Sequence, residues 1–339
     1  MSLAALQADH YRIPLAVTLS DATHGRMTHF ELVTVRLRTT DGAEGTGYTY
    51  TPGAGGAAIR VLIARELAPV LIGEDEARIA QLWQRMWWRL HYAGRGGAAS
   101  FAISAVDIAL WDLRALRQRM PLWRLLGGHD PRVKAYAGGI DLDFPLDQLQ
   151  RQTEEHLKRG FRAIKMKVGR PRLQEDVARV RAMRDALPAD TPLMVDANMR
   201  WSADEAIRAA RAFREHEVFW LEEPTIPDDV PGHVRIAREG GLPIAAGENL
   251  RTLHEFTRLI DMGGVSFPEP DVSNVGGVTV WLKVAHVAEA HNLPVTSHGV
   301  HDLHVHLLAA VPNASYLEVH GFGLERFIAE PLTIEDGEA

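Results

Sequence analysis

The stretch Val218-Phe219-Trp220-Leu221-Glu222 is a short apolar run that ends in an acid. Similar runs end at Asp196 and Glu248, so the three acids are separated by equal intervals of 26 residues (222−196 and 248−222). This spacing is typical of consecutive strand–helix units in a (β/α) barrel, where eight units share about 250 residues. Carboxylates at the carboxyl ends of adjacent strands converge, and three of them need a cation. A ligand set made only of oxygens predicts Mg²⁺.

The bulk composition is that of an ordinary globular protein, with 46% apolar and 24% charged residues among 339. The net charge of −7 and the lack of a basic cluster argue against a nucleic-acid partner. Without cysteine there is no disulfide, thiolate metal site or cysteine nucleophile. No apolar run reaches about 18 residues, so no membrane span is expected. The N-terminal residues do not resemble a signal peptide, and we expect a cytoplasmic protein.

Two kinds of pattern divide the chain, and its length favours two domains. Strand-like alternation within residues 11–50, with a turn at Asp41-Gly42, is followed by helical periodicity from 57 to 126. Beyond 129 short strand patterns alternate with helical ones, which predicts a parallel barrel. We predict an α+β capping domain at 1–128, a barrel at 129–319 and a segment at 320–339 that returns to the capping domain. The expected barrel strands are residues 133–138, 162–168, 192–196, 218–222, 243–247, 264–268, 294–297 and 315–319.

Other predicted barrel strands also carry ionisable groups at their ends. Lys165 and Lys167 are two residues apart, so both side chains lie on one face of their strand and are expected to point into the barrel mouth. Asp196 and Asn198 repeat this spacing. A surface pair of lysines and a polar turn after the strand are the alternative interpretations, but the equal spacing of the three acids favours a site.

The last strands add a histidine and further acids. Asp271 follows the sixth strand and His298 ends the seventh, and an aspartate beside a histidine orients the imidazole and raises its basicity. Such a histidine can move a proton, although a core or surface histidine is an equal alternative among the 16 in the chain. Glu318 closes the eighth strand, where a plain surface acid is the alternative. His301, His304 and His306 are predicted to lie on a helix surface and not to bind zinc.

Taken together, these residues resemble the enolase superfamily, in its mandelate racemase subgroup, over nearly the whole chain. The motifs that carry the resemblance are Lys165-Met166-Lys167, Asp196-Ala197-Asn198, Glu222-Glu223-Pro224, Gly247-Glu248-Asn249, Pro270-Asp271, Ser297-His298 and Leu317-Glu318. The resemblance implies an α/β fold with a modified (β/α)₇β TIM-type barrel and an N-terminal capping domain. Glu269 departs from the family's usual glutamine, and the chain ends at Ala339, before the family's usual glycine-rich return segment.

The resemblance also implies a role for each site residue. Asp196, Glu222 and Glu248 would hold Mg²⁺, with Glu223 as a supporting group. Lys167 would act as a base on one face of the substrate, and the His298–Asp271 pair would act on the other. Lys165 would neutralise the substrate carboxylate, and Glu318 would hydrogen-bond it. A lysine base must be neutral, and we expect Mg²⁺ and the Lys165 cation to lower the pKa of Lys167, because like charges disfavour its protonated form.

Two bases on opposite faces allow racemisation or epimerisation, dehydration, and cycloisomerisation. The capping loops at 20–26 and 48–51 are polar and similar to those of galactarate and L-talarate type acid-sugar dehydratases. His24, Arg26, Tyr48 and Asn198 are therefore candidate substrate-binding residues, and His24 or Arg26 is expected to bind a distal carboxylate. The leading hypothesis is Mg²⁺-dependent dehydration of a hexarate to a 2-keto-3-deoxy acid. A racemase or epimerase and a non-catalytic sugar-acid-binding barrel are the alternatives, and family resemblance suggests a homo-oligomer.

Overall fold

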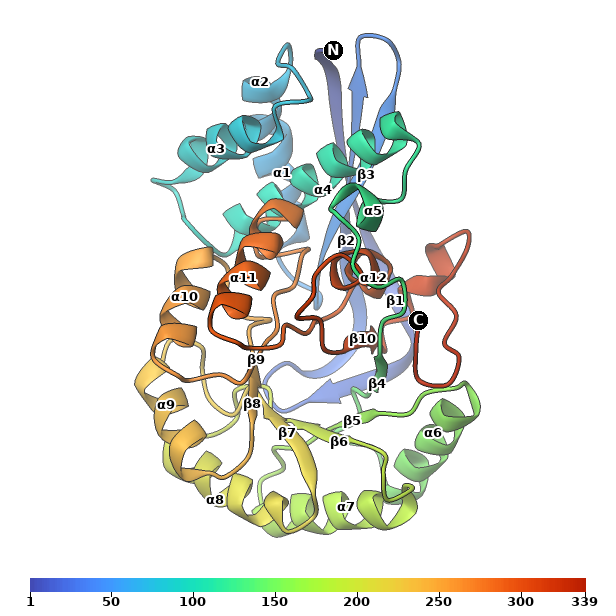
Figure 1. Cartoon of the computed structure of the whole chain (residues 1–339), viewed down its shortest axis with the longest axis vertical. Helices are drawn as coiled ribbons and strands as arrows, with labels where there is room; N and C mark the ends of the chain where they lie inside the picture. The colour runs from blue at the N-terminus through green and yellow to red at the C-terminus, as the bar shows by residue number, and fades with distance from the viewer.

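The computed structural model describes residues 1–339, and its chain forms a barrel with a capping unit above it (Figure 1). The capping unit begins with an antiparallel sheet in the order β1-β2-β3. Its strands are β1 (Leu3–Asp21), β2 (Gly25–Thr39) and β3 (Glu44–Thr51). The helices that follow are α1 (Gly56–Leu62), the π-helical turn η1 (Ile63–Leu67), α2 (Ala68–Leu71), α3 (Ile79–Leu90), α4 (Ala98–Gln118) and α5 (Leu122–Leu125). The first strand thus begins well before the predicted residue 11.

Alternating side chains explain how this sheet packs. Val33, Val35 and Leu37 of β2 are fully buried in one cluster with apolar residues of α4. The glycines of β3 let α4 come unusually close, because a Cβ at Gly47 would lie 2.1 Å from the carbonyl oxygen of Ala105. The long β1–β2 hairpin extends beyond this sheet and reaches the barrel (Figure 1).

The barrel sheet is parallel, in the order β10-β4-β5-β6-β7-β8-β9. A bridge between Val295 and Ala314 and the hydrogen bond from Thr296 N to Pro268 O fill the gap between β9 and β10, so residues 295–297 act as the seventh strand. The predicted barrel is confirmed. Its strands are β4 (Ala135–Gly138), β5 (Ile164–Lys167), β6 (Leu193–Asp196), β7 (Val218–Glu222), β8 (Ile244–Ala246), β9 (Phe267–Pro268) and β10 (Leu317–His320).

Helices cover the outside of this barrel (Figure 1). None of them is both long and apolar enough to cross a membrane. They are α6 (Leu146–Lys158), α7 (Leu173–Ala186), α8 (Ala203–Arg214), α9 (Val230–Glu239), α10 (Leu253–Asp261), α11 (Val278–Ala290) and α12 (His301–Leu308), with a 3₁₀ turn η2 (Leu324–Phe327) after β10.

The direction of the barrel side chains follows from strand periodicity. Trp220 and Met194 are fully buried in a cluster inside the barrel, with Trp220 5.6 Å from the ring of Tyr136. Glu222 and Asp196 are two residues further along the same strands, so they point to the same interior. The apolar filling thus lies below the acids, at the amino ends of the strands.

Two segments join the capping unit to the barrel mouth. The tip of the β1–β2 hairpin pairs Ser20 with Asp141, and Thr23 Oγ1 donates to the carbonyl oxygen of Asn198. After β10, Phe322 stacks on Phe30 of β2 at 5.5 Å, and the chain then returns to the barrel. Residues 320–339 therefore contact both units. We keep 1–128, 129–319 and 320–339 as the proposed division of the chain.

Candidate active site

Three buried carboxylates meet where β6, β7 and β8 end. The sheet register aligns Lys167 with Asp196 and Asp196 with Glu222, and Glu248 follows β8. Carboxylate oxygens of Asp196, Glu222 and Glu248 lie within 4.8 Å of one another. Such a set of hard oxygen ligands at the carboxyl ends of barrel strands fits Mg²⁺.

The electrostatics of this cluster favour the binding of a cation. Burial raises the pKa of Glu222 to about 8, and the nearby Asp196 and Glu318 add to the rise, although Lys165 opposes it. A carboxyl group with this pKa holds a proton at neutral pH, and a divalent cation that binds here would displace that proton. Burial likewise raises the pKa of Glu223, beside Glu248, and its carboxylate accepts a hydrogen bond from Asn249.

The two lysines of β5 make different contacts. Lys165 Nζ lies 2.5 Å from Glu222 Oε1 and 2.8 Å from Glu318 Oε1, and it is fully buried. Lys167 forms an ion pair with Asp196. Burial lowers the pKa of Lys167, and Lys165 lowers it further, but Asp196, Glu248 and Glu222 together outweigh both, so the pKa is raised. The expected lowering of this pKa by Lys165 is confirmed, although the surrounding carboxylates dominate, and its lowering by Mg²⁺ stays a prediction.

The predicted histidine–aspartate pair is present on the other side of the mouth. His298 Nδ1 lies 3.1 Å from Asp271 Oδ2, and its Nε2 lies 2.9 Å from Glu248 Oε2. Asp271 is in turn held by the backbone N–H and hydroxyl of Ser273. Burial lowers the pKa of His298, but Glu248, Glu318 and Asp271 together outweigh it, and the pKa lies well above its usual value.

Glu318 connects the two sides of the site. Its Oε1 contacts Lys165, and its Oε2 accepts a hydrogen bond of 2.8 Å from the backbone N–H of Gly299, next to His298. Lys167 leaves β5, whereas His298 follows the seventh strand, and β4 and β10 lie between them in the barrel order. The two proposed bases therefore approach the barrel mouth from different sides.

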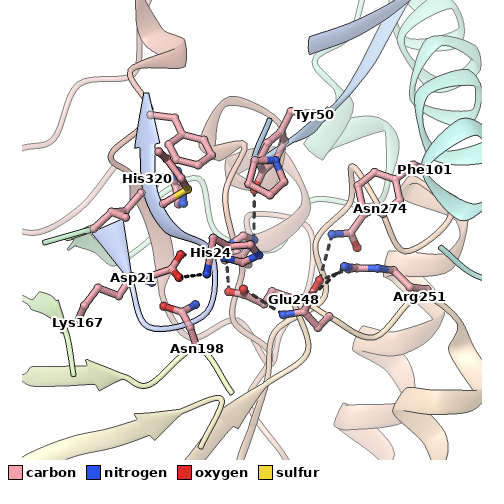
Figure 2. Close-up of a pocket in the computed structure, with 16 residues that line it drawn as sticks. Asp21, His24, Tyr50, Phe101, Lys167, Asn198, Glu248, Arg251, Asn274 and His320 are labelled. Atoms are coloured by element: carbon pink, nitrogen blue, oxygen red, sulfur yellow. Dashed lines mark hydrogen bonds and ion pairs between the residues drawn. The ribbon is translucent and has the colours of Figure 1, made fainter. Parts of the chain in front are cut away.

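A cavity lies above these groups and is lined by residues of both the barrel and the capping unit. The close-up shows Lys167 on one side of this cavity, Arg251 on the other, and His24 between them (Figure 2). Among the predicted substrate-binding residues, His24 and Asn198 line the cavity, with His24 Nδ1 2.9 Å from Asp21 Oδ2.

Arg26 and Tyr48 do not line this cavity. Arg26 is exposed on the hairpin, so the structure does not bring it to the site. The hydroxyl of Tyr48 donates to Asp302 at 2.6 Å, and Tyr50, two residues further along β3, reaches the cavity instead.

Several cavity residues were not predicted because they have no strand-end pattern. They are Asp21, Met27, Tyr50, Pro52, Phe101, Ile140, Asn249, Arg251, Asn274, His320 and Phe322. Arg251 follows the Gly247-Glu248-Asn249 motif closely, and the i, i+2 spacing of Glu318 and His320 was a usable signal. Burial lowers the pKa of His320 to about 3, so its imidazole is neutral.

The prediction for the α12 histidines needs a correction. His301 and His304 are buried, and His304 has no exposed surface. They are three residues apart and share the inner face of α12 with Leu308.

Glu269 departs from the family's usual glutamine. Burial raises the pKa of Glu269 far above its usual range, and neither of its carboxyl oxygens has a hydrogen-bond partner. We infer that this carboxyl group is neutral, like the glutamine usual at its position.

Models of known families match both parts of the chain. Residues 9–127 match the mandelate racemase/muconate lactonizing enzyme N-terminal domain, and residues 148–339 match the enolase C-terminal domain-like model. The chain belongs to the enolase superfamily. It is a member of the mandelate racemase and muconate lactonizing enzyme family, and it is therefore an enzyme.

Individual relatives cover nearly the whole length of this enolase superfamily member. It is 58% identical, over 98% of its chain and 92% of the relative, to a 3,6-anhydro-α-L-galactonate cycloisomerase from Streptomyces coelicolor. A racemase from Streptomyces coelicolor with bound magnesium has a TM-score of 0.97 and 56% identity, covering 99% of this chain and 93% of that one. An L-talarate dehydratase from a Polaromonas species, complexed with Mg and L-glucarate, has a TM-score of 0.93 and 38% identity, covering 99% and 91%.

These relatives and the carboxylate cluster confirm the predicted Mg²⁺ cofactor. They also place the enzyme among Mg²⁺-dependent enzymes that act on sugar acids. Cycloisomerases and dehydratases both occur among them, so the family does not by itself decide the reaction.

Proposed function

We propose that this enzyme removes the proton α to the carboxylate of a sugar acid and eliminates the oxygen substituent on the β-carbon. The product is a 2-keto-3-deoxy acid. The observation that carries this proposal is the arrangement of Lys167 and His298 on different sides of one cavity, directly above three buried carboxylates. A site for binding alone needs no base on either side.

Asp196, Glu222 and Glu248 would hold Mg²⁺, and Lys165 and Glu318 would bind the substrate carboxylate. When bound, Mg²⁺ supplies positive charge that stabilises the negative charge developing on the substrate carboxylate. Lys165 adds a second charge at a fully buried position, where an electrostatic interaction is strong. Both favour the transition state because the extra negative charge appears only as the proton leaves.

Proton transfer is assigned to the two facing groups. Lys167 takes the α-proton in its neutral form, and His298, held by Asp271, gives a proton to the departing β-oxygen. The electron pair of the C–H bond moves into the substrate carboxylate to give an enediolate, and it then forms the double bond of an enol as the C–O bond breaks. The enol then takes a proton from solvent at the former β-carbon and becomes the ketone.

The same elimination describes both kinds of relative. In a dehydratase the departing oxygen leaves as water. In a 3,6-anhydro-hexonate the oxygen on carbon 3 belongs to a ring ether, so it stays attached to carbon 6 as a hydroxyl and the overall reaction is an isomerisation.

We propose the anhydro sugar acid as the preferred substrate. The 58% identity along the whole chain supports it. The cavity supports it too, because Met27, Ile140 and Phe322 provide apolar surface beside the neutral His320. An ether ring presents C–H groups to such surface, whereas each hydroxyl of an open-chain hexarate needs a polar partner.

Hexarate dehydration is the second candidate, and the charged side chains of the cavity favour it. His24 and Arg251 both line the cavity, and Arg251 lies far from Lys167 (Figure 2). Either can bind a second carboxylate. Epimerisation, in which the enediolate keeps its β-oxygen and regains a proton on the other face of carbon 2, is a third candidate, and a homo-oligomer stays a prediction.

Turnover assays separate these candidates. The enzyme with Mg²⁺ is incubated separately with 3,6-anhydro-L-galactonate, galactarate and L-talarate, and 2-keto-3-deoxy acid is measured by NMR. We expect keto acid from the anhydro acid at the highest kcat/KM, and none with Lys167→Ala. Inversion at carbon 2 without keto acid would favour the epimerase, and no reaction with any of the three acids would refute the proposed elimination.

A further inference from the structure

The turn after His298 has an unusual backbone. Gly299 has a φ of +64° and Val300 a φ of +22°. Positive φ is rare for residues with a side chain and is an outlier for a β-branched one. Val300 is fully buried and precedes the first turn of α12. The surrounding structure must hold this conformation, and conformations of this kind concentrate at functional sites.

His304 makes contacts that hold the turn. Its Nδ1 lies 3.0 Å from the carbonyl oxygen of Gly299, and its Nε2 lies 3.0 Å from the backbone nitrogen of Val272. Gly299 is the residue after His298, and Val272 is the residue after Asp271. One fully buried imidazole therefore joins the two segments that carry the histidine–aspartate pair.

These partners determine the position of the proton on the ring. A carbonyl oxygen can only accept, so Nδ1 must carry the proton, and a backbone N–H can only donate, so Nε2 must be unprotonated. Only the neutral ring with its proton on Nδ1 satisfies both bonds. Burial lowers the pKa of His304, which agrees with a neutral ring.

Neighbouring groups keep this imidazole in place. Trp281 is fully buried, its ring lies 6.2 Å from that of His304, and its indole N–H donates to the carbonyl oxygen of Pro270. The segment before Asp271 is thus held from α11 and the segment after it from α12. Asp271 Oδ2 and His298 Nδ1, which these segments carry, lie 3.1 Å apart.

We propose that His304 is a positioning residue: through Gly299 and Val272 it sets the geometry of the His298–Asp271 pair. This inference rests on the proposed function of that pair. His304 does not itself line the cavity, so its effect is on the proton-transfer step and not on substrate binding.

Two variants separate positioning from packing. His304→Gln keeps one donor and one acceptor, whereas His304→Leu keeps only the bulk. With the Mg²⁺-loaded enzyme and its best sugar acid, we expect His304→Leu to lower kcat about 10- to 100-fold with KM nearly unchanged, as loss of a supporting partner does. His304→Gln should recover most of that loss. His306→Leu on the same helix is the control, because His306 makes no side-chain hydrogen bond, and its kcat should stay unchanged.

Equal losses of kcat in His304→Gln and His304→Leu, or full kcat in both, would overturn the proposal. A second measurement does not depend on turnover. Nitrogen-15 spectra of the histidine-labelled enzyme, with His304 assigned by comparison with His304→Gln, should show the proton on Nδ1 near neutral pH. A proton on Nε2 overturns the inference even if the elimination is correct. If the spectrum shows the proton on Nδ1 but no sugar acid gives keto acid, the proposed position of His304 is supported and only the proposed function is refuted.

Discussion

Lys167 and Asp196 are register partners on the neighbouring strands β5 and β6, and their side chains form a buried ion pair. The pairing places the proposed base beside a proposed metal ligand, so the protonation of one depends on the charge of the other. Because Asp196 raises the pKa of Lys167, removing its charge should make the lysine easier to deprotonate.

Asp196→Asn should weaken Mg²⁺ binding by more than the about 10- to 100-fold that loss of a supporting group costs. The variant removes a charged ligand and also leaves the buried Lys167 without its partner. Isothermal titration with MgCl₂ measures the affinity. Asp190→Asn, at an exposed acid, should bind Mg²⁺ as the parent does. Unchanged affinity in Asp196→Asn would remove this residue from the ligand set.

Mg²⁺ binding should depend on pH through Glu222. Its pKa is raised to about 8, so below that pH the cation must displace a proton. The apparent affinity should fall about tenfold for each pH unit below this pKa and level off above it. Titration in buffers of different ionisation enthalpy should show nearly one proton released at neutral pH. An affinity that does not change with pH would contradict a protonated Glu222.

Arg251→Lys should weaken Mg²⁺ binding about 10- to 100-fold, because Arg251 holds the segment that carries Glu248. Its guanidinium donates to the carbonyl oxygen of Glu248 and, at 2.9 Å, to Asn249 Oδ1. Lysine cannot make both bonds in this geometry. The exposed Arg238→Lys serves as control in the same titration. Parent-like Mg²⁺ affinity in Arg251→Lys would show that the segment carrying Glu248 keeps its position without the two bonds from Arg251.

Gly299→Ala should impair both stability and turnover. A Cβ at this position would lie 2.6 Å from the hydroxyl oxygen of Tyr50, and the backbone has a φ of +64°. Gly263→Ala measures the backbone cost alone, because its φ is +72° and no atom lies within 4 Å. Urea unfolding should show a loss of about 1–3 kcal/mol for the backbone conformation in both, and a further loss only in Gly299→Ala. Adding Tyr50→Phe should recover part of that further loss, and equal losses in the two alanine variants would contradict the contact.

Asp107 should make stability depend on pH. This fully buried carboxylate on α4 accepts hydrogen bonds from the backbone and hydroxyl of Thr279 at the start of α11. Burial raises its pKa from 3.8 to about 7, so the folded chain binds a proton that the unfolded chain releases. The free energy of unfolding should therefore fall as pH rises between those values. Asp107→Asn should remove this part of the pH dependence in urea unfolding, and an unchanged profile would contradict it.

The sequence was sufficient to predict the parts of the site that follow strand geometry. Equal spacing after apolar runs located Asp196, Glu222 and Glu248, and the period of two located Lys165 and Lys167 on one face. These arguments work because backbone geometry alone sets where the carboxyl end of a barrel strand points.

Residues on turns and in the capping unit were harder to predict. Arg26 and Tyr48 were predicted from their chemistry. Arg26 is exposed on the hairpin and does not line the cavity, and the hydroxyl of Tyr48 donates a hydrogen bond to Asp302. His304 was predicted at the surface because the three α12 histidines do not all share a face. The face that it shares with His301 is the buried one, and only tertiary packing shows this.

The most direct test of the central claim is elimination of a sugar acid in D₂O, followed by NMR. We predict that keto acid forms only with Mg²⁺ present, that it has lost the hydrogen of carbon 2, and that it carries one solvent deuterium at carbon 3. Lys167→Ala should form none. Keto acid formed at full rate in excess EDTA, or by Lys167→Ala, would contradict proton abstraction by this lysine beside a magnesium site.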